Sequence, residues 1–276
     1  MQKQLLRTFT LAAATLTVSA CATTSTGRRQ LAFMPESTMA SMGVQAFQQI
    51  KDEGKVETDP ATNAYVKCVA KAVLDAMPDQ DYAAWDVVVF QDETPNAFAL
   101  PGNKIGVHTG ILPVASTQAQ LAAIMGHEVG HVLLHHGNER ASQTVLAQTA
   151  LSAGAIALSD MEEGKRDAVL GTLGIGAQVG ILLPFSRTHE TEADEVGQQF
   201  MAKAGFNPQE AVTLWENMAK LSEGQAPPEF LSTHPASASR IKALNKGLAT
   251  TTPIYNEALA AGRSPECTVA LPPSAK

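Results

Sequence analysis

The sequence predicts an α+β fold, in which a small antiparallel sheet lies beside a mainly helical body. Trp85 to Phe90 is a β-branched run, which is typical of a strand. Residues 97–100 and 104–107 flank the turn signal Pro101-Gly102-Asn103, so we expect them to form a hairpin. Most of the remaining chain has apolar residues at helical spacing.

Predicted helices occupy the chain on both sides of this sheet. Helical spacing and suitable start residues occur at 36–52 and 60–77. A further helix is expected at 117–136. More helices are expected at about 140–158, 165–183, 187–204, 208–222 and 236–248, and Asn207-Pro208 and His234-Pro235 mark two of the starts.

The composition is that of a globular protein. The chain has 276 residues and a net charge of −7, and its pI is near 5.5. An acidic chain lacks the basic stripe that nucleic-acid binding needs, so no nucleic-acid partner is expected.

One motif on the predicted helix 117–136 carries chemistry. His127-Glu128-Val129-Gly130-His131 has the pattern HExxH, which places both histidines on one helix face. Two such imidazoles can bind one Zn²⁺, and Glu128 can then act as general base toward a water molecule on the metal. Leu134 and Gly137 stand where a metzincin would need glycine and a third histidine, which excludes that class.

A second motif offers the remaining metal ligand. Glu190 and Asp194 lie at i, i+4 in a predicted helix, so one carboxylate can bind zinc while the other fixes the tautomer of a ligand histidine. Two histidines and one glutamate form the catalytic zinc site of thermolysin-type enzymes. His135 is the other candidate for the third ligand, but three turns of a straight helix rarely converge on one tetrahedral metal.

These segments resemble a known family. The matching segments are residues 126–131, 136–140, 186–194 and 96–102, and Ser232-Thr233-His234-Pro235 through Arg240-Ile241. Together they resemble the integral-membrane heat-shock peptidase and CAAX prenyl protease family of zinc peptidases, over about residues 60 to 248, in a periplasmic bacterial lipoprotein branch. The resemblance implies a zincin-like metallopeptidase fold with one Zn²⁺ per chain. It also implies Glu190 as the third ligand, Glu192 as a neighbour, and Asp194 as the partner of a ligand histidine.

The resemblance also suggests roles for residues outside HExxH. It implies that Asn96, Ala97, Phe98 and Ala99 form an edge strand that pairs with an extended substrate. His234, held before Pro235, can donate a hydrogen bond to the oxyanion with Arg240 nearby, or it can occupy the fourth zinc position. The remaining alternative is a histidine at a helix start with no catalytic part. His189 is expected to face elsewhere on its helix, and His136, Glu139 and Arg140 are expected to make helix-end and loop hydrogen bonds.

The N-terminus predicts export and lipid attachment. Basic Lys3 and Arg7 precede the apolar segment 9–18, which is typical of a signal peptide. Val18-Ser19-Ala20-Cys21 resembles a lipobox, and Ala22 favours outer-membrane sorting by the same resemblance. We therefore expect a signal peptide at 1–20, a lipidated tether at 21–35, and a single metallopeptidase domain at 36–276. The expected location is the periplasmic face of the bacterial outer membrane, with Cys21 acylated.

Two cysteines remain when the candidate lipidation site is set aside. Cys68 and Cys267 form an even pair in an oxidising compartment. A disulfide between them would attach the C-terminal tail to the body. Two free thiols are the alternative, because sequence gives no geometry.

The predicted function is hydrolysis of peptide bonds by a zinc endopeptidase. Misfolded or misassembled envelope proteins are the expected substrates, and outer-membrane proteins are further expected partners. The alternative is an envelope assembly factor or chaperone with a latent or structural zinc site. The apolar residues 144–185 are expected to form a helical hairpin over the zinc cleft, which could also contact the membrane or a partner.

Overall fold

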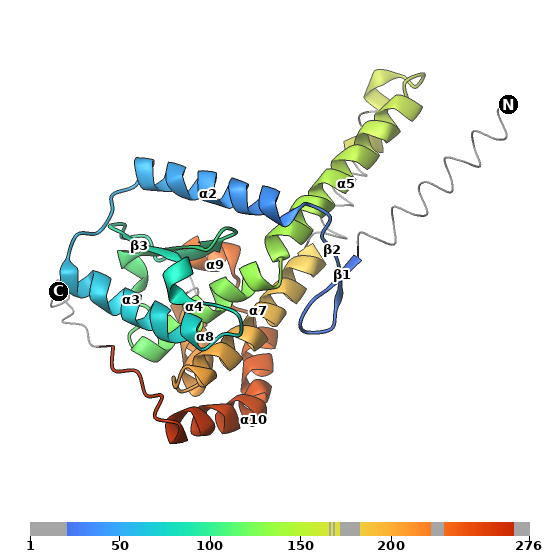
Figure 1. Cartoon of the computed structure of the whole chain (residues 1–276). Helices are drawn as coiled ribbons and strands as arrows, with labels where there is room; N and C mark the ends of the chain where they lie inside the picture. The colour runs from blue at the N-terminus through green and yellow to red at the C-terminus, as the bar shows by residue number, and fades with distance from the viewer. Residues whose placement is uncertain (1–20, 166, 168, 172–182, 222–228, 268–276) are drawn as a thin grey trace. The chain divides into compact units, whose positions relative to one another are not determined.

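The computed structural model describes residues 21–165, 167, 169–171, 183–221 and 229–267 (Figure 1). Its contacts divide the chain into two compact units. The first unit contains residues 1–39 and 134–189, and the second contains 40–133 and 190–276. Most of the helix expected at 165–183 lies outside the described residues.

The second unit contains a mixed three-stranded sheet. Its strands are β3 (Asp86–Phe90), β4 (Ala97–Leu100) and β5 (Lys104–His108), in the order β3-β5-β4. β4 and β5 form the expected antiparallel hairpin, but β3 pairs in parallel with β5, so the purely antiparallel arrangement was wrong. The turn signal determines only the hairpin partner, and nothing local in the sequence sets the direction of β3.

Aromatic side chains join this sheet to helix α2 (Glu36–Glu53). Phe47 of α2 packs with Phe90 and Val88 in one buried cluster, and Phe98 contacts that cluster. The Phe90 and Phe98 rings are stacked with their centroids 6.2 Å apart. The sheet is thereby covered on this face by large apolar groups, which stabilise it through burial.

Helices form most of the remaining regular structure described in the second unit. α4 packs against α3, α8 and β4, and α8 packs against α10. Asp59 caps α3 by accepting the Thr62 N–H at 2.7 Å. α10 continues well beyond the expected end at 248. The bounds are α3 Pro60–Asp75, η1 Tyr82–Ala84, η2 Thr109–Ile111, α4 Gln118–Leu133, α7 Leu183–Lys203, α8 Gln209–Leu221, α9 Glu229–Thr233 and α10 Ala238–Ala260.

A disulfide fastens the C-terminal segment to this unit. Cys68 of α3 is bonded to Cys267, with 5.6 Å between the two Cα atoms. The Gln118 side chain at the start of α4 accepts the Cys267 N–H at 2.8 Å and donates to the Pro265 carbonyl at 2.9 Å. The tail therefore holds the N-terminal end of the helix that carries HExxH.

The first unit combines a short hairpin with a long helix. β1 (Cys21–Thr23) and β2 (Arg29–Leu31) pair antiparallel, and β2 packs against α5 (His136–Ala157). The expected tether at 21–35 thus contains regular structure. His135 adopts a left-handed conformation with φ 55°, which ends α4 before the expected boundary and separates it from α5.

No helix in the described ranges combines the length and apolar character that crossing a membrane requires. Part of the segment 144–185 lies outside those ranges, and its contact with a membrane or partner stays a prediction. Residues 1–20 also lie outside the described part of the chain, so the signal peptide and the acylation of Cys21 stay predictions.

Candidate metal centre

Helix α4 presents three polar side chains from a buried stretch. The Thr117 hydroxyl oxygen accepts the Gln120 N–H at 3.1 Å, which satisfies an amide at the start of the helix. One turn separates His127 from His131, and their Nε2 atoms lie 3.0 Å apart. Glu128 follows His127 directly and is also buried. The helix therefore brings two imidazoles and one carboxylate to one place.

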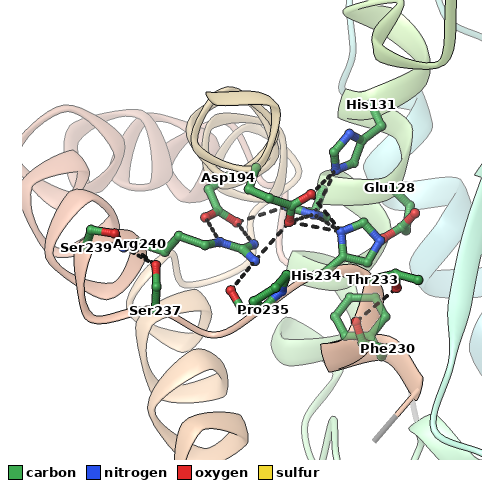
Figure 2. A network of polar contacts seen from close by, with 12 residues as sticks. Glu128, His131, Asp194, Phe230, Thr233, His234, Pro235, Ser237, Ser239 and Arg240 are labelled. Atoms are coloured by element: carbon green, nitrogen blue, oxygen red, sulfur yellow. Dashed lines mark hydrogen bonds and ion pairs between the residues drawn. The ribbon is translucent and has the colours of Figure 1, made fainter. Parts of the chain in front are cut away.

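Glu190 and Asp194 of α7 approach the same histidines. The Glu190 carboxylate oxygens lie 3.3 Å from Nε2 of His127 and 3.4 Å from Nε2 of His131. Asp194 Oδ1 lies 2.9 Å from the other ring nitrogen of His127, Nδ1. Glu190 thus faces the nitrogens that would bind a metal, whereas Asp194 holds the far side of the His127 ring. Figure 2 shows the Asp194 carboxylate beside the guanidinium of Arg240.

Two glycines allow α4 and α7 to come this close. A β-carbon on Gly197 would lie 2.7 Å from the His127 backbone nitrogen. A β-carbon on Gly126 would lie 2.8 Å from the Gly197 carbonyl oxygen. Both contacts are with backbone, which cannot turn aside, so this crossing requires residues without side chains.

His234 reaches the site from the segment between α9 and α10. Its Nδ1 lies 2.9 Å from Glu190 Oε2 and 3.2 Å from His127 Nε2. Its Nε2 lies 3.4 Å from Glu128 Oε1. The imidazole therefore stands among the candidate ligands, although it is far from HExxH in sequence.

The residues present fit a zinc ion. The ligand atoms of His127, His131, Glu190 and His234 all lie within 4.8 Å of one another, and they form the one such group among the described residues. Three imidazoles and one carboxylate are a donor set that zinc prefers. Among the described residues, none makes a hydrogen bond to the buried Oε1 atom of Glu128, which suits a carboxylate that acts on a water molecule.

Arg240 is directed at carboxylates. Its Nε and NH2 groups each donate to Asp194 at 2.7 Å, and its NH1 group lies 2.9 Å from Glu190. NH1 also donates to the Pro235 carbonyl at 3.1 Å. The side chain is buried at the start of α10. In this geometry Arg240 holds two acidic groups in place, and its predicted role near a developing oxyanion stays a prediction.

Hydrogen bonds decide which of these buried groups carry charge. Burial would lower the pKa of His127, but its bonds to Asp194 and Glu190 raise that pKa to about 9. Burial lowers the pKa of His131 to about 3. Burial would raise the pKa of Glu190, but hydrogen bonds from three histidines hold it far below its usual range. Glu190 is therefore an anion, the form in which a carboxylate can bind a metal.

The pKa values of the Glu128 and Asp194 carboxyl groups are shifted in opposite directions. Burial raises the pKa of Glu128 above its ordinary value. Burial would also raise the pKa of Asp194, but the charge and hydrogen bonds of Arg240 lower it. Asp194 thus stays an anion that accepts hydrogen bonds, while Glu128 is shifted toward the range in which a carboxylate can exchange a proton.

β4 forms one edge of the three-stranded sheet. The Asn96 carbonyl accepts the His108 N–H at 3.0 Å, and Phe98 is paired with Gly106. Hydrogen-bonded pairs alternate along an antiparallel ladder, so the backbone groups of Ala97 and Ala99 point away from β5. β4 also packs against α4. The backbone that the sequence analysis assigned to substrate pairing therefore lies at a sheet edge, next to the helix that carries HExxH.

The other histidines near these motifs belong to the first unit. His189 Nε2 lies 3.0 Å from Glu139 Oε2, and the His189 ring stacks on that of His136. Arg28 donates to both oxygens of Glu139, at 2.9 and 2.7 Å. Glu139 thus makes a partly buried ion pair that reaches the N-terminal hairpin, and no local sequence pattern predicts this pair.

Trp215 and Phe230 are site neighbours that sequence reasoning missed. The Trp215 ring lies 5.9 Å from the ring of His127, and the Phe230 ring lies 4.8 Å from that of His234. Both are apolar residues in helices, where spacing predicts only that they are buried. No local signal separates such residues from the rest of the core.

Comparison with known proteins agrees with this geometry. Residues 60–247 match Peptidase family M48, a stretch that contains HExxH, Glu190, His234 and Arg240. The chain belongs to peptidase family M48. Membership of this family is consistent with the predicted enzyme class, a zinc metalloendopeptidase.

Several curated members of the M48 family are similar to this chain. The mitochondrial metalloendopeptidase OMA1 of Schizosaccharomyces pombe is 39% identical over 191 residues, which cover 68% of this chain and 53% of the relative. The OMA1 metalloendopeptidase of Danio rerio is 33% identical, with coverages of 80% and 48%. The β-barrel assembly-enhancing protease of Escherichia coli is 27% identical, with coverages of 72% and 42%. The chain spans about half the length of the curated relatives it matches.

These relatives correct the predicted location. The lipobox-like N-terminal segment predicts a lipoprotein branch at the bacterial outer membrane. The similar M48 proteins include mitochondrial enzymes from two fungi, a plant and a fish, which contradicts that location. The short lipobox-like pattern at Cys21 did not carry enough information to determine the compartment.

Proposed function

We propose that this M48 chain hydrolyses peptide bonds in misfolded or misassembled proteins. One observation carries the proposal: His127, His131 and Glu190 converge on one point, with the carboxylate of Glu128 beside them. That arrangement matches the requirements of a hydrolytic zinc site, which needs three ligands and a general base.

Different residues of the chain would bind the metal, orient its ligands and transfer the proton during hydrolysis. His127, His131 and Glu190 would hold the zinc ion, and Asp194 keeps His127 in the tautomer whose Nε2 faces the site. Glu128 takes a proton from the attacking water and delivers it to the leaving amine. Zinc, when bound, supplies a Lewis acid that polarises the carbonyl and acidifies water.

The edge strand β4 suggests how a substrate is held. The outward backbone groups of Ala97 and Ala99 could pair with an extended polypeptide. Pairing of this kind depends on main-chain groups, which every unfolded chain exposes. A preference for misfolded or misassembled proteins is consistent with this mode of binding, and the similar Escherichia coli protein is named a β-barrel assembly-enhancing protease.

The decisive experiment measures cleavage of an unfolded model protein by the purified chain. We expect cleavage with zinc, none after chelation, and recovery when zinc is restored. Glu128→Gln should lower the rate by about 10²-fold or more and keep the zinc, because Gln cannot accept a proton. Glu190→Ala should lose zinc, whereas Glu192→Ala should keep it. Zinc-independent cleavage, or full activity in Glu128→Gln, would contradict the proposal.

A second candidate is an assembly factor whose zinc site is latent. One observation favours it: His234 stands within the ligand group, where a fourth protein ligand would exclude substrate. A latent factor would bind unfolded protein with the same affinity in wild type and Glu128→Gln, and neither would cleave it. Turnover by the wild type alone separates the two candidates.

A further inference from the structure

One guanidinium group fixes two carboxylates of the zinc site. Arg240 donates twice to Asp194 at 2.7 Å and lies 2.9 Å from Glu190. Asp194 in turn orients His127, and Glu190 faces both histidines of HExxH. The position of Arg240 therefore affects two of the three ligands.

The flat face of this guanidinium rests on an indole ring. The Arg240 Cζ atom lies 3.7 Å from the centroid of the Trp215 ring. Trp215 is 3% exposed, and so is Arg240. The indole also stacks on Phe230, with 5.8 Å between ring centroids. Trp215 is thus a buried platform, held in place by its own aromatic neighbour.

An aromatic face suits this position for a physical reason. The N–H groups of a guanidinium lie in its plane, so the hydrogen bonds to Asp194 and Glu190 leave its faces without polar partners. An indole face attracts the cation through its quadrupole and does not compete for the carboxylates. The attraction is strongest where water is excluded, as at this buried pair. An aliphatic side chain would fill the space and lack the attraction.

We propose that Trp215 is a positioning residue of the zinc site that acts through Arg240. The proposal rests on the proposed zinc peptidase function and adds a specific requirement to it. Trp215 keeps the guanidinium in the one orientation that aligns Asp194 behind His127 and Glu190 in front of it. Loss of the indole should therefore loosen the ligands, although Trp215 is not itself one of the candidate ligands.

Trp215→Leu tests this role against Trp85→Leu, because these are the two tryptophans of the chain and both are buried. We expect Trp215→Leu to weaken zinc binding about tenfold, measured by competition with a chromophoric chelator. Trp215→Phe keeps an aromatic face and should stay within about threefold of wild type, and Trp85→Leu should do the same. Equal losses in both Leu variants would show a purely structural role and overturn the proposal. If Trp215→Leu does not fold, Trp215→Met takes its place, because the flexible thioether fills irregular gaps.

A double-mutant cycle tests whether Trp215 acts through Arg240. The cycle combines Trp215→Leu with Arg240→Met and compares zinc affinity and kcat in all four proteins. If Arg240 is the intermediary, Trp215→Leu should have little further effect once Arg240→Met is present. Additive effects would overturn the proposal. Zinc affinity is measured without any substrate, so the result stands even if the chain proves not to cleave peptides.

Discussion

The Oδ1 atom of Asp194 lies 2.9 Å from the Nδ1 atom of His127, and this contact determines which ring nitrogen can face a metal. A carboxylate accepts a hydrogen bond, so Nδ1 carries the proton and Nε2 is left as the ligand atom. Nε2 is the atom that lies near Glu190 and His131. The contact between α7 and α4 therefore prepares His127 for zinc before zinc binds.

Replacement of Asp194 by Asn should weaken the preference of His127 for the tautomer that binds zinc through Nε2. An amide can present its N–H₂ group to Nδ1 and favour the wrong tautomer, and it also loses the charge that pairs with Arg240. We expect zinc affinity or kcat to fall about 10- to 100-fold, measured by chelator competition and by proteolysis of an unfolded protein. Unchanged values in a folded Asp194→Asn protein would show that the carboxylate does not orient His127.

Replacement of Gly197 by Ala should separate the two metal-binding helices. The new β-carbon would lie 2.7 Å from the His127 backbone nitrogen, so α7 has to move away from α4. Misplacement of catalytic groups by about 1 Å can cost about 10²-fold in rate. We expect a comparable loss of activity, weaker zinc binding and a lower Tm.

Gly154→Ala is the matched control for that variant. Within the described part of the chain, its β-carbon would meet only the Leu170 side chain, at 3.5 Å, which is an ordinary contact. Alanine favours helix over glycine by up to about 1 kcal/mol, so this variant should keep or raise the Tm. If both alanine variants behave alike, the close crossing of α4 and α7 does not limit the site.

The spacing of residues along the sequence correctly predicted which site residues lie on the same face of a helix. His127 and His131, and likewise Glu190 and Asp194, are four residues apart, so helix geometry alone predicted that each pair shares a face. The hairpin of β4 and β5 was also predictable, since Gly102 and Asn103 supply the positive φ angles of its turn, 83° and 61°.

The spacing of residues along the sequence did not predict which residues of different helices contact one another. The stacking of Trp215 on Arg240 depends on how α8 packs against α10, and neither residue carries a local signal of it. The parallel pairing of β3 with β5 likewise depends on tertiary packing, which local sequence does not reveal. The glycine contact between Gly126 and Gly197 is a further case, because each glycine alone predicts only a flexible or tightly packed position.

Glu139 should make stability depend on pH in the acid range. Burial would raise its pKa, but Arg28 and His189 lower it from 4.5 to about 2. A carboxyl group with a lowered folded-state pKa contributes stability above its unfolded pKa, and that contribution is lost as pH falls from about 4.5 to about 2. The part that depends on pH is on the order of 3 kcal/mol.

Glu139→Gln tests this directly. The difference in unfolding free energy between wild type and Glu139→Gln should be largest near pH 6 and shrink below pH 4.5. Unfolding is measured with a chelator present, so that loss of zinc does not contribute. Glu257, an exposed glutamate, supplies the control variant Glu257→Gln. A difference that stays constant from pH 6 to pH 3 would show that the ion pair with Arg28 does not lower the pKa of Glu139.

His234→Ala separates two roles of the imidazole that stands among the zinc ligands. Its Nδ1 lies 2.9 Å from Glu190 and 3.2 Å from His127, so the ring occupies the position of a fourth ligand. We therefore expect His234→Ala to raise basal proteolysis, because the site no longer has to release a histidine before substrate enters. A site that is open one-tenth of the time would gain about tenfold. Absorption spectra of the cobalt-substituted protein would report the loss of one nitrogen ligand.

If His234 instead donates to the oxyanion, kcat should fall by about 10²- to 10³-fold and the cobalt spectrum should stay the same. Unchanged activity together with an unchanged spectrum would reject both roles and leave His234 as a structural residue before Pro235.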